Sequence, residues 1–306
     1  MQITIFGTGA MACLFGAGLA PVANVTLLGA WAAGLQAIHE RGIRVEPAAG
    51  PAMAISVGAA SLDQPTPPAD MVLVLVKTWQ TPRVAAELPA RLKPGGLALT
   101  LQNGLGNLEQ LGPSARLGVT TLGATLLGPG RVRPGGQGPT HVAGPAWMAA
   151  TLAAAGFEAH TAAEQAIDSL LWGKLAINCG INALTALLRV PNGELLRRPD
   201  AQLLMEQAAA ECAAVAAARG ILLPYADAPA EARAVAARTA SNHSSMFQDI
   251  LRSAPTEIEA INGAVARAGQ ELRVPVPLNT TLWHLVRASA TGHPLPAGDH
   301  GPRNEV

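Results

Sequence analysis

Three polar residues lie one helical turn apart in an apolar segment near the middle of the chain. Lys174, Asn178 and Asn182 occupy positions i, i+4 and i+8 of residues 169–188, whose other members are mostly apolar or small. In a helix this spacing places the three side chains along one face. Buried ammonium and amide groups are costly unless a partner satisfies them. The stripe therefore has two interpretations: a site for a small molecule carrying carbonyl, hydroxyl or carboxylate oxygens, or a polar seam bonded to a neighbouring helix.

The N-terminal residues favour the first interpretation. Residues 1–6 are an apolar, β-branched run typical of a buried strand, and residues 13–20 favour a helix. Between them Gly7 permits a tight turn, Gly9 lets backbone amides approach a pyrophosphate, and Ala12 allows close packing of helix on strand. This G-x-G-x-x-A pattern predicts a dinucleotide site, and an ordinary glycine-rich βα turn is the alternative. The predicted contact residues are Gly7, Thr8, Gly9, Ala10, Met11 and Ala12.

Bulk composition excludes several classes of function. The 306 residues carry no net formal charge, and only 14% of them are charged, so we expect neither a nucleic-acid partner nor a membrane-attracting basic face. The N-terminus lacks the basic region of a signal peptide, and apolar runs such as residues 71–76 are too short to span a bilayer. We therefore expect a cytoplasmic protein without a membrane segment.

The sequence offers no pattern for a metal site. Cys13, Cys179 and Cys212 are isolated, and no Cys/His spacing typical of a metal site occurs. They are interpreted as free thiols in a reducing compartment. His293 and His300, near the C-terminus, are interpreted as exposed tail residues rather than metal ligands.

The first half of the chain alternates strand-like and helix-like segments, which predicts an α/β fold with a doubly wound, Rossmann-type parallel sheet. From about residue 164 the pattern is helical throughout and is interrupted by prolines. We therefore expect a dinucleotide-binding domain over residues 1–163, an all-helical substrate and catalytic domain over 164–291, and a loose tail over 292–306. Strands are expected over residues 3–6, 25–28, 71–76, 97–101 and 119–124, with an added hairpin within 42–62. Helices are expected over 164–189, 200–219, 228–240, 255–269 and 278–290.

Further polar residues lie where ligands bind in such a fold. Lys77 and Asn103 each follow a predicted strand, and ligands of open α/β sheets bind beyond the carboxyl ends of strands. Both side chains are therefore expected to border the cofactor, and ordinary loop positions are the alternative. Ser245 and Glu257 lie in polar segments of the helical half. The structural alternative for Ser245 is a helix cap with its first turn, and that for Glu257 is the start of the next helix.

Five blocks, in order over nearly the whole chain, resemble the ketopantoate reductase (2-dehydropantoate 2-reductase) family. They are Gly7–Ala12, Val76–Gln80, Gln102–Gly104, the Lys174/Asn178/Asn182 helix with residues 191–195, and residues 244–249 with 256–263. The resemblance implies a Rossmann domain, a helical second domain, and NADPH-dependent reduction of ketopantoate to pantoate in pantothenate and coenzyme A synthesis.

The resemblance also implies roles for individual residues. Lys174 matches the catalytic lysine, and the ammonium of a lysine can stabilise and protonate the oxygen that gains charge during hydride transfer. Glu257 is expected to accept a hydrogen bond from a substrate hydroxyl and to help orient Lys174. The substrate-side positions are Asn178, Asn182, Asn192 and Ser245, and further cofactor-side positions are Lys77, Asn103 and Ala124.

One departure affects the cofactor. Where the family usually has a basic residue for the 2′-phosphate of NADPH, this chain has Gly29 and Ala30. The acidic ribose contact of an NAD enzyme is missing there as well. NADPH is the prediction from resemblance, and NAD stays open as an alternative. Arg41, Arg44 and Lys77 are the candidates to replace the lost basic group.

Two other functions remain as alternatives to ketopantoate reduction. One is reduction of another 2-oxo acid, and the other is NAD(P)H sensing without catalysis. A small-molecule 2-oxo acid is the expected partner, and the protein is expected to be a monomer or a homodimer.

Overall fold

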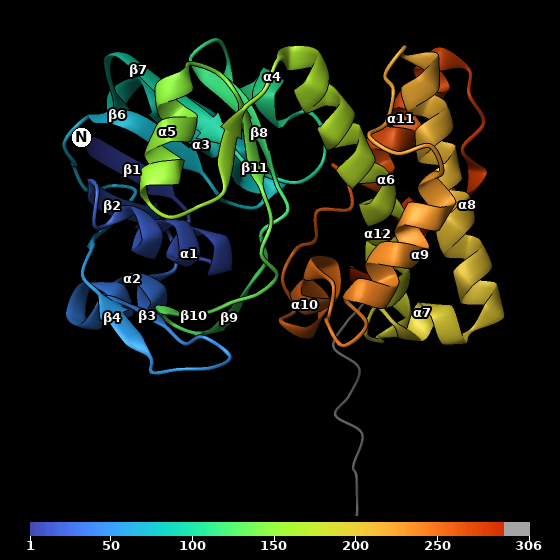
Figure 1. The fold of residues 1–306 in the computed structure, drawn as a ribbon, viewed down its shortest axis with the longest axis horizontal. Coiled ribbons are helices and arrows are strands. Elements are labelled where there is room, and N and C mark those ends of the chain that lie inside the picture. The colour runs from blue at the N-terminus through green and yellow to red at the C-terminus, as the bar shows by residue number, and fades with distance from the viewer. Residues whose placement is uncertain (291–306) are drawn as a thin grey trace, which may run out of the picture. The chain divides into compact units, whose positions relative to one another are not determined.

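The computed structural model describes residues 1–290, and the predicted tail, with His293 and His300, lies outside them. The chain divides into two compact units. The first unit comprises Met1–Lys174 with Ile221–Pro224, and the second comprises Leu175–Gly220 with the described residues from Tyr225 onward. Helix α6 (Glu164–Leu188) runs through this division (Figure 1). The domain boundary predicted between residues 163 and 164 coincides with the start of α6 and stays a prediction.

The first unit is built on an eight-stranded sheet in the order β12-β11-β8-β7-β6-β1-β2-β5. From β5 to β8 in this order neighbouring strands are parallel, whereas β11 is antiparallel to β8. The chain runs from β1 outward to β2 and β5 and then crosses to β6, which is the doubly wound arrangement predicted from the sequence. The strands are β1 (Gln2–Phe6), β2 (Asn24–Gly29), β5 (Gly58–Ser61), β6 (Ala69–Val74), β7 (Leu92–Thr100), β8 (Ala115–Thr120), β11 (Thr140–Ala143) and β12 (Ala159–Thr161).

Both faces of this sheet are buried, which explains why its inner strands are almost wholly apolar. Ile3 and Ile5 point into one core, which α1 (Ala10–Leu19) and α5 (Ala146–Ala154) cover. Val72 and Val74 point into the opposite core, which α3 (Thr81–Arg91) and α4 (Asn107–Leu111) cover. The first half of the chain also contains helix α2 (Ala32–Arg41) and the 3₁₀ helix η1 (Thr78–Gln80).

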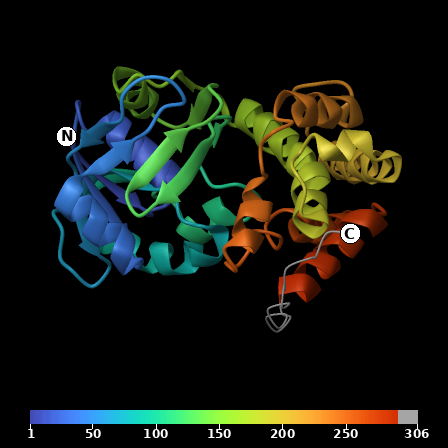
Figure 2. The same ribbon diagram turned by 90° about the horizontal axis from the view of Figure 1, so that it is seen from below.

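A second, four-stranded sheet has the order β4-β3-β10-β9. Its strands are β3 (Ile43–Val45), β4 (Met53–Ile55), β9 (Ala124–Gly128) and β10 (Arg131–Pro134). Val45 and Val132 share a core with α1, so this small sheet lies against that helix (Figures 1 and 2). The hairpin predicted within residues 42–62 is confirmed, because β3 and β4 pair antiparallel.

One predicted strand is wrong. Residues 119–124 do not form a single strand, because β8 ends at Thr120 and β9 begins at Ala124. The amides of Thr121 and Gly123 instead bond the carbonyl oxygens of Pro139 and Gly136, each at 3.1 Å. The connection thereby leaves the main sheet and enters the small one.

The second unit is helical, as predicted. Gly180 lets α6 approach α8 closely, since a Cβ there would lie 2.6 Å from the carbonyl oxygen of Met205. The helix predicted over residues 255–269 begins only at Asn262, because the carbonyl of Glu257 accepts the amides of Ala260 and Ile261 in a turn. The helices are α7 (Glu194–Arg197), α8 (Pro199–Ala218), α9 (Ala228–Arg238), α10 (Ser245–Leu251), α11 (Asn262–Leu272) and α12 (Pro277–Ala290).

The three cysteines are free, as the sequence predicted, and the structure shows that all three are buried. Burial raises the pKa of the Cys13 thiol to about 12, so this group is not a reactive thiolate at neutral pH. By length and composition α6 could cross a membrane, but 67% of its apolar window is buried inside the protein, as in the core helix of a globular protein.

Candidate functional site

The turn after β1 has the backbone that a dinucleotide requires. Gly7 has φ +128°, and a Cβ there would lie 2.9 Å from the carbonyl oxygen of Leu75, so only glycine fits. Gly9 has an ordinary φ of −83°, and a Cβ on it would meet nothing within 4 Å. Helix α1 starts at Ala10 without a side-chain cap, which leaves amides of its first turn for an anion. The turn therefore fits a pyrophosphate beside Gly9.

The end of β2, where an adenosine ribose would lie, carries neither a basic nor an acidic residue of its own. Gly29 packs tightly on the side chain of Thr8, because a Cβ on Gly29 would lie 2.9 Å from Thr8 Cγ2. Ala30 follows and is exposed. Arg41 closes the far end of α2, a helix of ten residues that spans about 15 Å at 1.5 Å per residue. Arg41, and Arg44 in the strand that follows, are thus remote from the end of β2.

The neighbouring strand β5 brings an acidic residue to this edge of the sheet. Ser61 pairs with Gly29, so Asp63 follows two residues beyond that register. A hydrogen bond from the Ser61 hydroxyl holds the pKa of Asp63 below its usual value, and Arg83 acts in the same direction. An ionised carboxylate therefore follows β5 at the edge of the sheet where β2 also ends. Sequence reasoning missed it because β5 was not recognised as a strand of the main sheet.

Lys77 and Asn103 follow β6 and β7, and a buried hydrogen-bond network ties these two strand ends together. The amide of Gln102 donates to the Val76 carbonyl and to the Thr81 hydroxyl, each at 3.0 Å. Its oxygen accepts the Thr100 hydroxyl at 2.9 Å. Gln102 is only 7% exposed, and its bonds to the Thr81 and Thr100 hydroxyls are buried away from bulk water.

A second buried amide extends this network to Asn103. The side chain of Asn107 donates to the Asn103 carbonyl and accepts the Thr81 hydroxyl, each at 3.0 Å. The backbone amide of Lys77 donates to the Gln80 side chain at 3.3 Å. The structure therefore places Lys77 and Asn103 at the carboxyl ends of adjacent parallel strands, on a shared and rigid framework.

The tertiary fold also brings Lys174 to this edge of the sheet. Its ammonium donates to the carbonyl oxygen of Thr120, the last residue of β8, at 2.8 Å. Strands β8, β7, β6 and β1 are parallel neighbours, so the lysine lies at the same carboxyl edge as the Gly7–Ala12 turn. It lies on the side of β1 opposite to β2. In Rossmann folds β2 contacts the adenosine ribose, so the other half of a bound dinucleotide would extend toward the side of Lys174.

The two asparagines of the stripe continue along α6 at one-turn intervals. Asn178 is half-buried and Asn182 is 6% exposed. About one turn beyond Asn182, Thr185 donates to the Ser244 hydroxyl at 2.7 Å and so fastens α10 to α6. Ser244 also caps α10 by accepting the Phe247 amide at 3.1 Å. The cap predicted as the structural alternative for this segment is therefore present, and Ser245 is the first residue of the capped helix.

Two more predicted substrate-side groups are buried in the second unit. Asn192 is 7% exposed and donates to the Thr239 hydroxyl at 2.9 Å. Its side-chain oxygen is buried and has no hydrogen-bond partner within residues 1–290. Glu257 is 4% exposed and lies in the turn before α11. A buried amide oxygen without a partner is the kind of acceptor that a ligand hydroxyl satisfies.

No grouping of three or more His, Cys, Asp or Glu residues that could hold a metal ion occurs within residues 1–290.

Comparison with known proteins is consistent with this geometry. A family model described as "Ketopantoate reductase PanE/ApbA" matches residues 3–146, and one described as "Ketopantoate reductase PanE/ApbA C terminal" matches residues 166–290. A relative from Halobacterium salinarum named 2-dehydropantoate 2-reductase is 36% identical, over 94% of this chain and 98% of its own. A relative of the same name from Archaeoglobus fulgidus is 35% identical, over 95% and 98%.

Solved structures have the same fold. A PanE/ApbA family ketopantoate reductase from Ralstonia eutropha aligns with a TM-score of 0.85 and 33% identity, covering 95% of this chain and 98% of that one. D-mandelate dehydrogenase with NADH and anilino(oxo)acetate aligns with a TM-score of 0.86 and 27% identity over the same shares. With both family models and the relatives spanning nearly its whole length, the chain belongs to the ketopantoate reductase family.

Proposed function

We propose that the protein is a nicotinamide-dependent reductase that converts ketopantoate to pantoate. Family membership and the names of its relatives support an oxidoreductase of this kind. The observation that carries the proposal is the bond from Lys174 to the Thr120 carbonyl, because it holds an ammonium at the nicotinamide side of the sheet edge.

The proposed chemistry divides between the cofactor and this chain's own groups. The reduced nicotinamide supplies the hydride when bound. The Gly7–Ala12 turn and the first amides of α1 hold the pyrophosphate, with Lys77, Asn103 and Ala124 toward the nicotinamide half. An ammonium has three donors, so Lys174 can keep its bond to Thr120 while another N–H meets the substrate oxygen. There it stabilises the charge that develops on the oxygen and delivers the proton.

On the substrate side we assign oxygen-binding roles to amides and a hydroxyl, and an accepting role to a carboxylate. Glu257 accepts a hydrogen bond from the substrate hydroxyl and helps to orient Lys174. The partnerless oxygen of Asn192 supports a polar ligand near it. The oxygen-binding groups are Asn178, Asn182, Asn192 and Ser245.

NADPH is the proposed cofactor, with a weak preference over NADH. Family resemblance supports NADPH, whereas the end of β2 offers Ala30 in place of a basic residue. The ionised Asp63 beside it disfavours a 2′-phosphate, and the remoteness of Arg41 and Arg44 leaves Lys77 as the candidate replacement among the three. A preference within about tenfold follows if no basic group replaces the missing contact.

A second candidate is reduction of another 2-oxo acid. The structural similarity to D-mandelate dehydrogenase bound to NADH and anilino(oxo)acetate favours it. A third candidate, NAD(P)H sensing without catalysis, shares the cofactor site but not the need for Lys174. We further propose residues 1–163 as the cofactor domain, residues 164–291 as the substrate domain, a cytoplasmic location, and a monomer or homodimer.

Lys174→Met tests the proposal directly, and the chain supplies a matched control. Of its three lysines, Lys93 lies at the amino-terminal end of β7, at the edge of the sheet opposite to Lys174, and pairs with Asp70 at 2.9 Å. We expect Lys174→Met to lower kcat for ketopantoate by about 10²–10⁴-fold, the usual contribution of a positioned acid. Lys93→Met should leave kcat unchanged, and both variants should bind NADPH as the wild type does.

Lys174→Arg separates charge from proton delivery, because arginine keeps the charge but is not deprotonated in proteins. We expect it to retain part of the rate that Lys174→Met loses. Near-wild-type turnover in Lys174→Met would refute the assignment. If the wild type reduces other 2-oxo acids but not ketopantoate, and Lys174→Met loses that activity, reduction of another 2-oxo acid is favoured. If the wild type binds the cofactor but reduces no 2-oxo acid, NAD(P)H sensing is favoured.

A further inference from the structure

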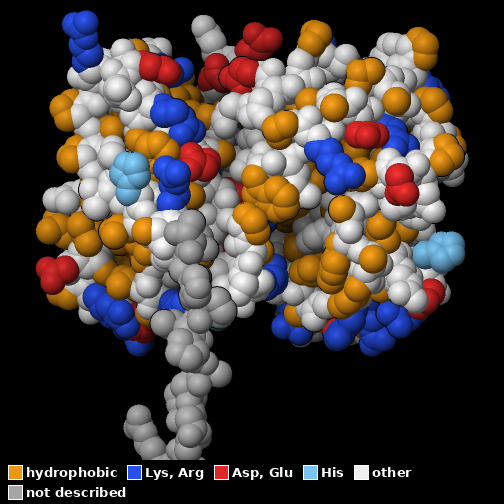
Figure 3. Space-filling model, turned by 180° about the vertical axis from the view of Figure 1, so that it is seen from behind, with side chains coloured by type: hydrophobic (Ala, Val, Ile, Leu, Met, Phe, Trp, Pro, Cys, Tyr) orange, Lys and Arg blue, Asp and Glu red, His pale blue; other side chains and the backbone are white. Residues whose placement is uncertain are grey.

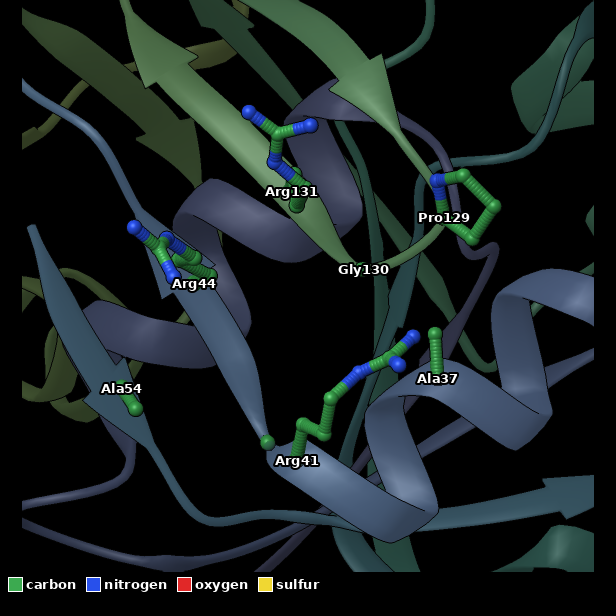
Figure 4. A pocket seen from close by; sticks show the side chains of 8 residues that line it. Ala37, Arg41, Arg44, Ala54, Pro129, Gly130 and Arg131 are labelled. Carbon is green, nitrogen blue, oxygen red and sulfur yellow. The ribbon is translucent and has the colours of Figure 1, made fainter.

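The first unit has a pocket of about 500 Å³ that contains none of the residues assigned above to the cofactor or the substrate. It opens between the end of α2, the strands β3 and β4, and the turn that joins β9 to β10 (Figure 4). Arg41, Arg44 and Arg131 border it, and Ala37, Ala54 and Pro129 form part of its apolar wall. Its volume is in the range of ordinary small-molecule sites.

This pocket is distinct from the proposed cofactor site. Helix α2 leaves the carboxyl edge of the main sheet after β2, and Arg41 is its last residue, about 15 Å along the helix. Strand β9 leaves the same edge at Ala124, and the turn at Pro129 and Gly130 is at its opposite end. The pocket therefore lies at the amino-terminal edge, away from the Gly7–Ala12 turn.

Positive charge is in surplus here, although the chain as a whole is neutral. Lys and Arg side chains gather at the lower right of Figure 3, on the part of that face where the small sheet lies. Glu46 is shared between Arg131 at 2.8 Å and Arg44 at 3.0 Å, and Arg133 also acts on it. The bond from Arg131 holds the pKa of Glu46 below its usual value, so one carboxylate offsets these three guanidinium groups.

Arg41 is the available anchor. Within residues 1–290 its guanidinium makes no hydrogen bond or ion pair, and the carboxylate of the preceding residue, Glu40, accepts the Gln36 amide at 2.8 Å. Figure 4 shows Arg41 extending from α2 on one side of the opening, with Arg44 and Arg131 on the strands opposite. An anion in the pocket would thus meet Arg41 from α2, with Arg44 and Arg131 bordering the opening from β3 and β10.

We propose that this pocket binds a small organic phosphate, with Arg41 as its principal anchor. Guanidinium groups bind phosphate oxygens in a bidentate manner, and a phosphate monoester carries about −1.5 to −2 charges at neutral pH. That charge matches the local surplus better than a single carboxylate does. The walls of Ala37, Ala54 and Pro129 accept an apolar body on the ester. The inference does not depend on the proposed reductase activity.

Calorimetric titration of the full-length protein with phenyl phosphate tests the proposal. It is run with and without saturating NADPH, so that phosphate binding at the cofactor turn is separated from binding at the arginines. We expect binding to persist with NADPH present and to weaken about 10- to 100-fold in Arg41→Ala, the range for one charge-assisted contact. Arg198→Ala, which removes an exposed charge in the second unit, is the matched control and should bind normally.

Two comparisons make the test specific. Glu46→Gln should strengthen binding, because it frees Arg44 and Arg131 from their shared carboxylate. Benzoate and inorganic phosphate should each bind more weakly than phenyl phosphate, since one lacks the second charge and the other the apolar body. Loss of binding with NADPH present, or equal binding by Arg41→Ala, would overturn the site. Equal binding of benzoate or of inorganic phosphate would overturn the ligand class.

Discussion

Two glycines of the N-terminal turn should respond to alanine in opposite ways. Gly7 has φ +128°, and a Cβ on it would lie 2.9 Å from the Leu75 carbonyl oxygen and 3.3 Å from the Ala12 Cβ. Gly9 has φ −83° and ψ −171°, which any residue adopts, and its Cβ would meet nothing within 4 Å. Gly7→Ala should therefore damage the fold, whereas Gly9→Ala should damage only the binding of a ligand over the turn.

The expected magnitudes follow from these two environments. For Gly7→Ala the strained φ costs about 1–3 kcal/mol and the overpacking about 1–3 kcal/mol. At about 2–4 °C per kcal/mol, the melting midpoint should fall by roughly 4–24 °C. Gly9→Ala should be neutral or stabilising by about 0.4–1 kcal/mol. Its methyl group would occupy the space of the pyrophosphate and weaken a charge-assisted contact of about 1.5–3 kcal/mol, or roughly ten- to hundredfold in Kd.

Thermal melts of the free proteins and equilibrium titrations with NADPH and NADH measure both effects. The reasoning predicts a large drop in Tm for Gly7→Ala alone and a large rise in Kd for Gly9→Ala at unchanged Tm. Wild-type affinity for both cofactors in a folded Gly9→Ala protein would refute pyrophosphate binding at this turn. A fall in the Tm of Gly9→Ala would show that the free protein has no room for a methyl group on Gly9.

Three further measurements test the charged groups. Ala30→Arg should raise the NADPH-to-NADH ratio of kcat/KM by about one to two orders of magnitude, the worth of one phosphate contact; an unchanged ratio would mean that another basic group already holds the 2′-phosphate. Glu257→Gln should reduce kcat/KM for ketopantoate more than for a 2-oxo acid without the hydroxyl, at unchanged Kd for NADPH; equal losses would contradict the hydroxyl contact. Burial, with Glu164 and Glu109 nearby, raises the pKa of the Asp168 carboxyl. Ionisation of Asp168 therefore destabilises the folded protein at pH values above this raised pKa. The destabilisation disappears as the pH falls below the ordinary pKa of 3.8. Asp168→Asn should therefore raise Tm at pH 7 and lose this advantage toward pH 4; a gain independent of pH would exclude the electrostatic cause.

Local patterns in the sequence were sufficient to predict the architecture, and they singled out the N-terminal turn and the polar stripe as candidate sites. The strand–turn–helix pattern around Gly7–Ala12 predicted the turn, because its backbone demands act within a few residues. Alternation of apolar strands and helices predicted the doubly wound sheet, since burial on both faces imposes that composition. The stripe of Lys174, Asn178 and Asn182 was visible because a helix has a fixed period.

The tertiary structure decided what depends on pairing between distant segments. The short, Gly- and Ala-rich strand β5 joins the main sheet by pairing with β2, and this register places Ser61 opposite Gly29, two residues before Asp63. The bond between Lys174 and Thr120 spans 54 residues, and no local pattern specifies it. The arginine pocket likewise combines the end of α2 with a turn almost 90 residues later. The period of apolar residues in the sequence encodes which face of a helix or strand is buried. Which other element that face packs against depends on side-chain packing and hydrogen bonding over the whole first unit.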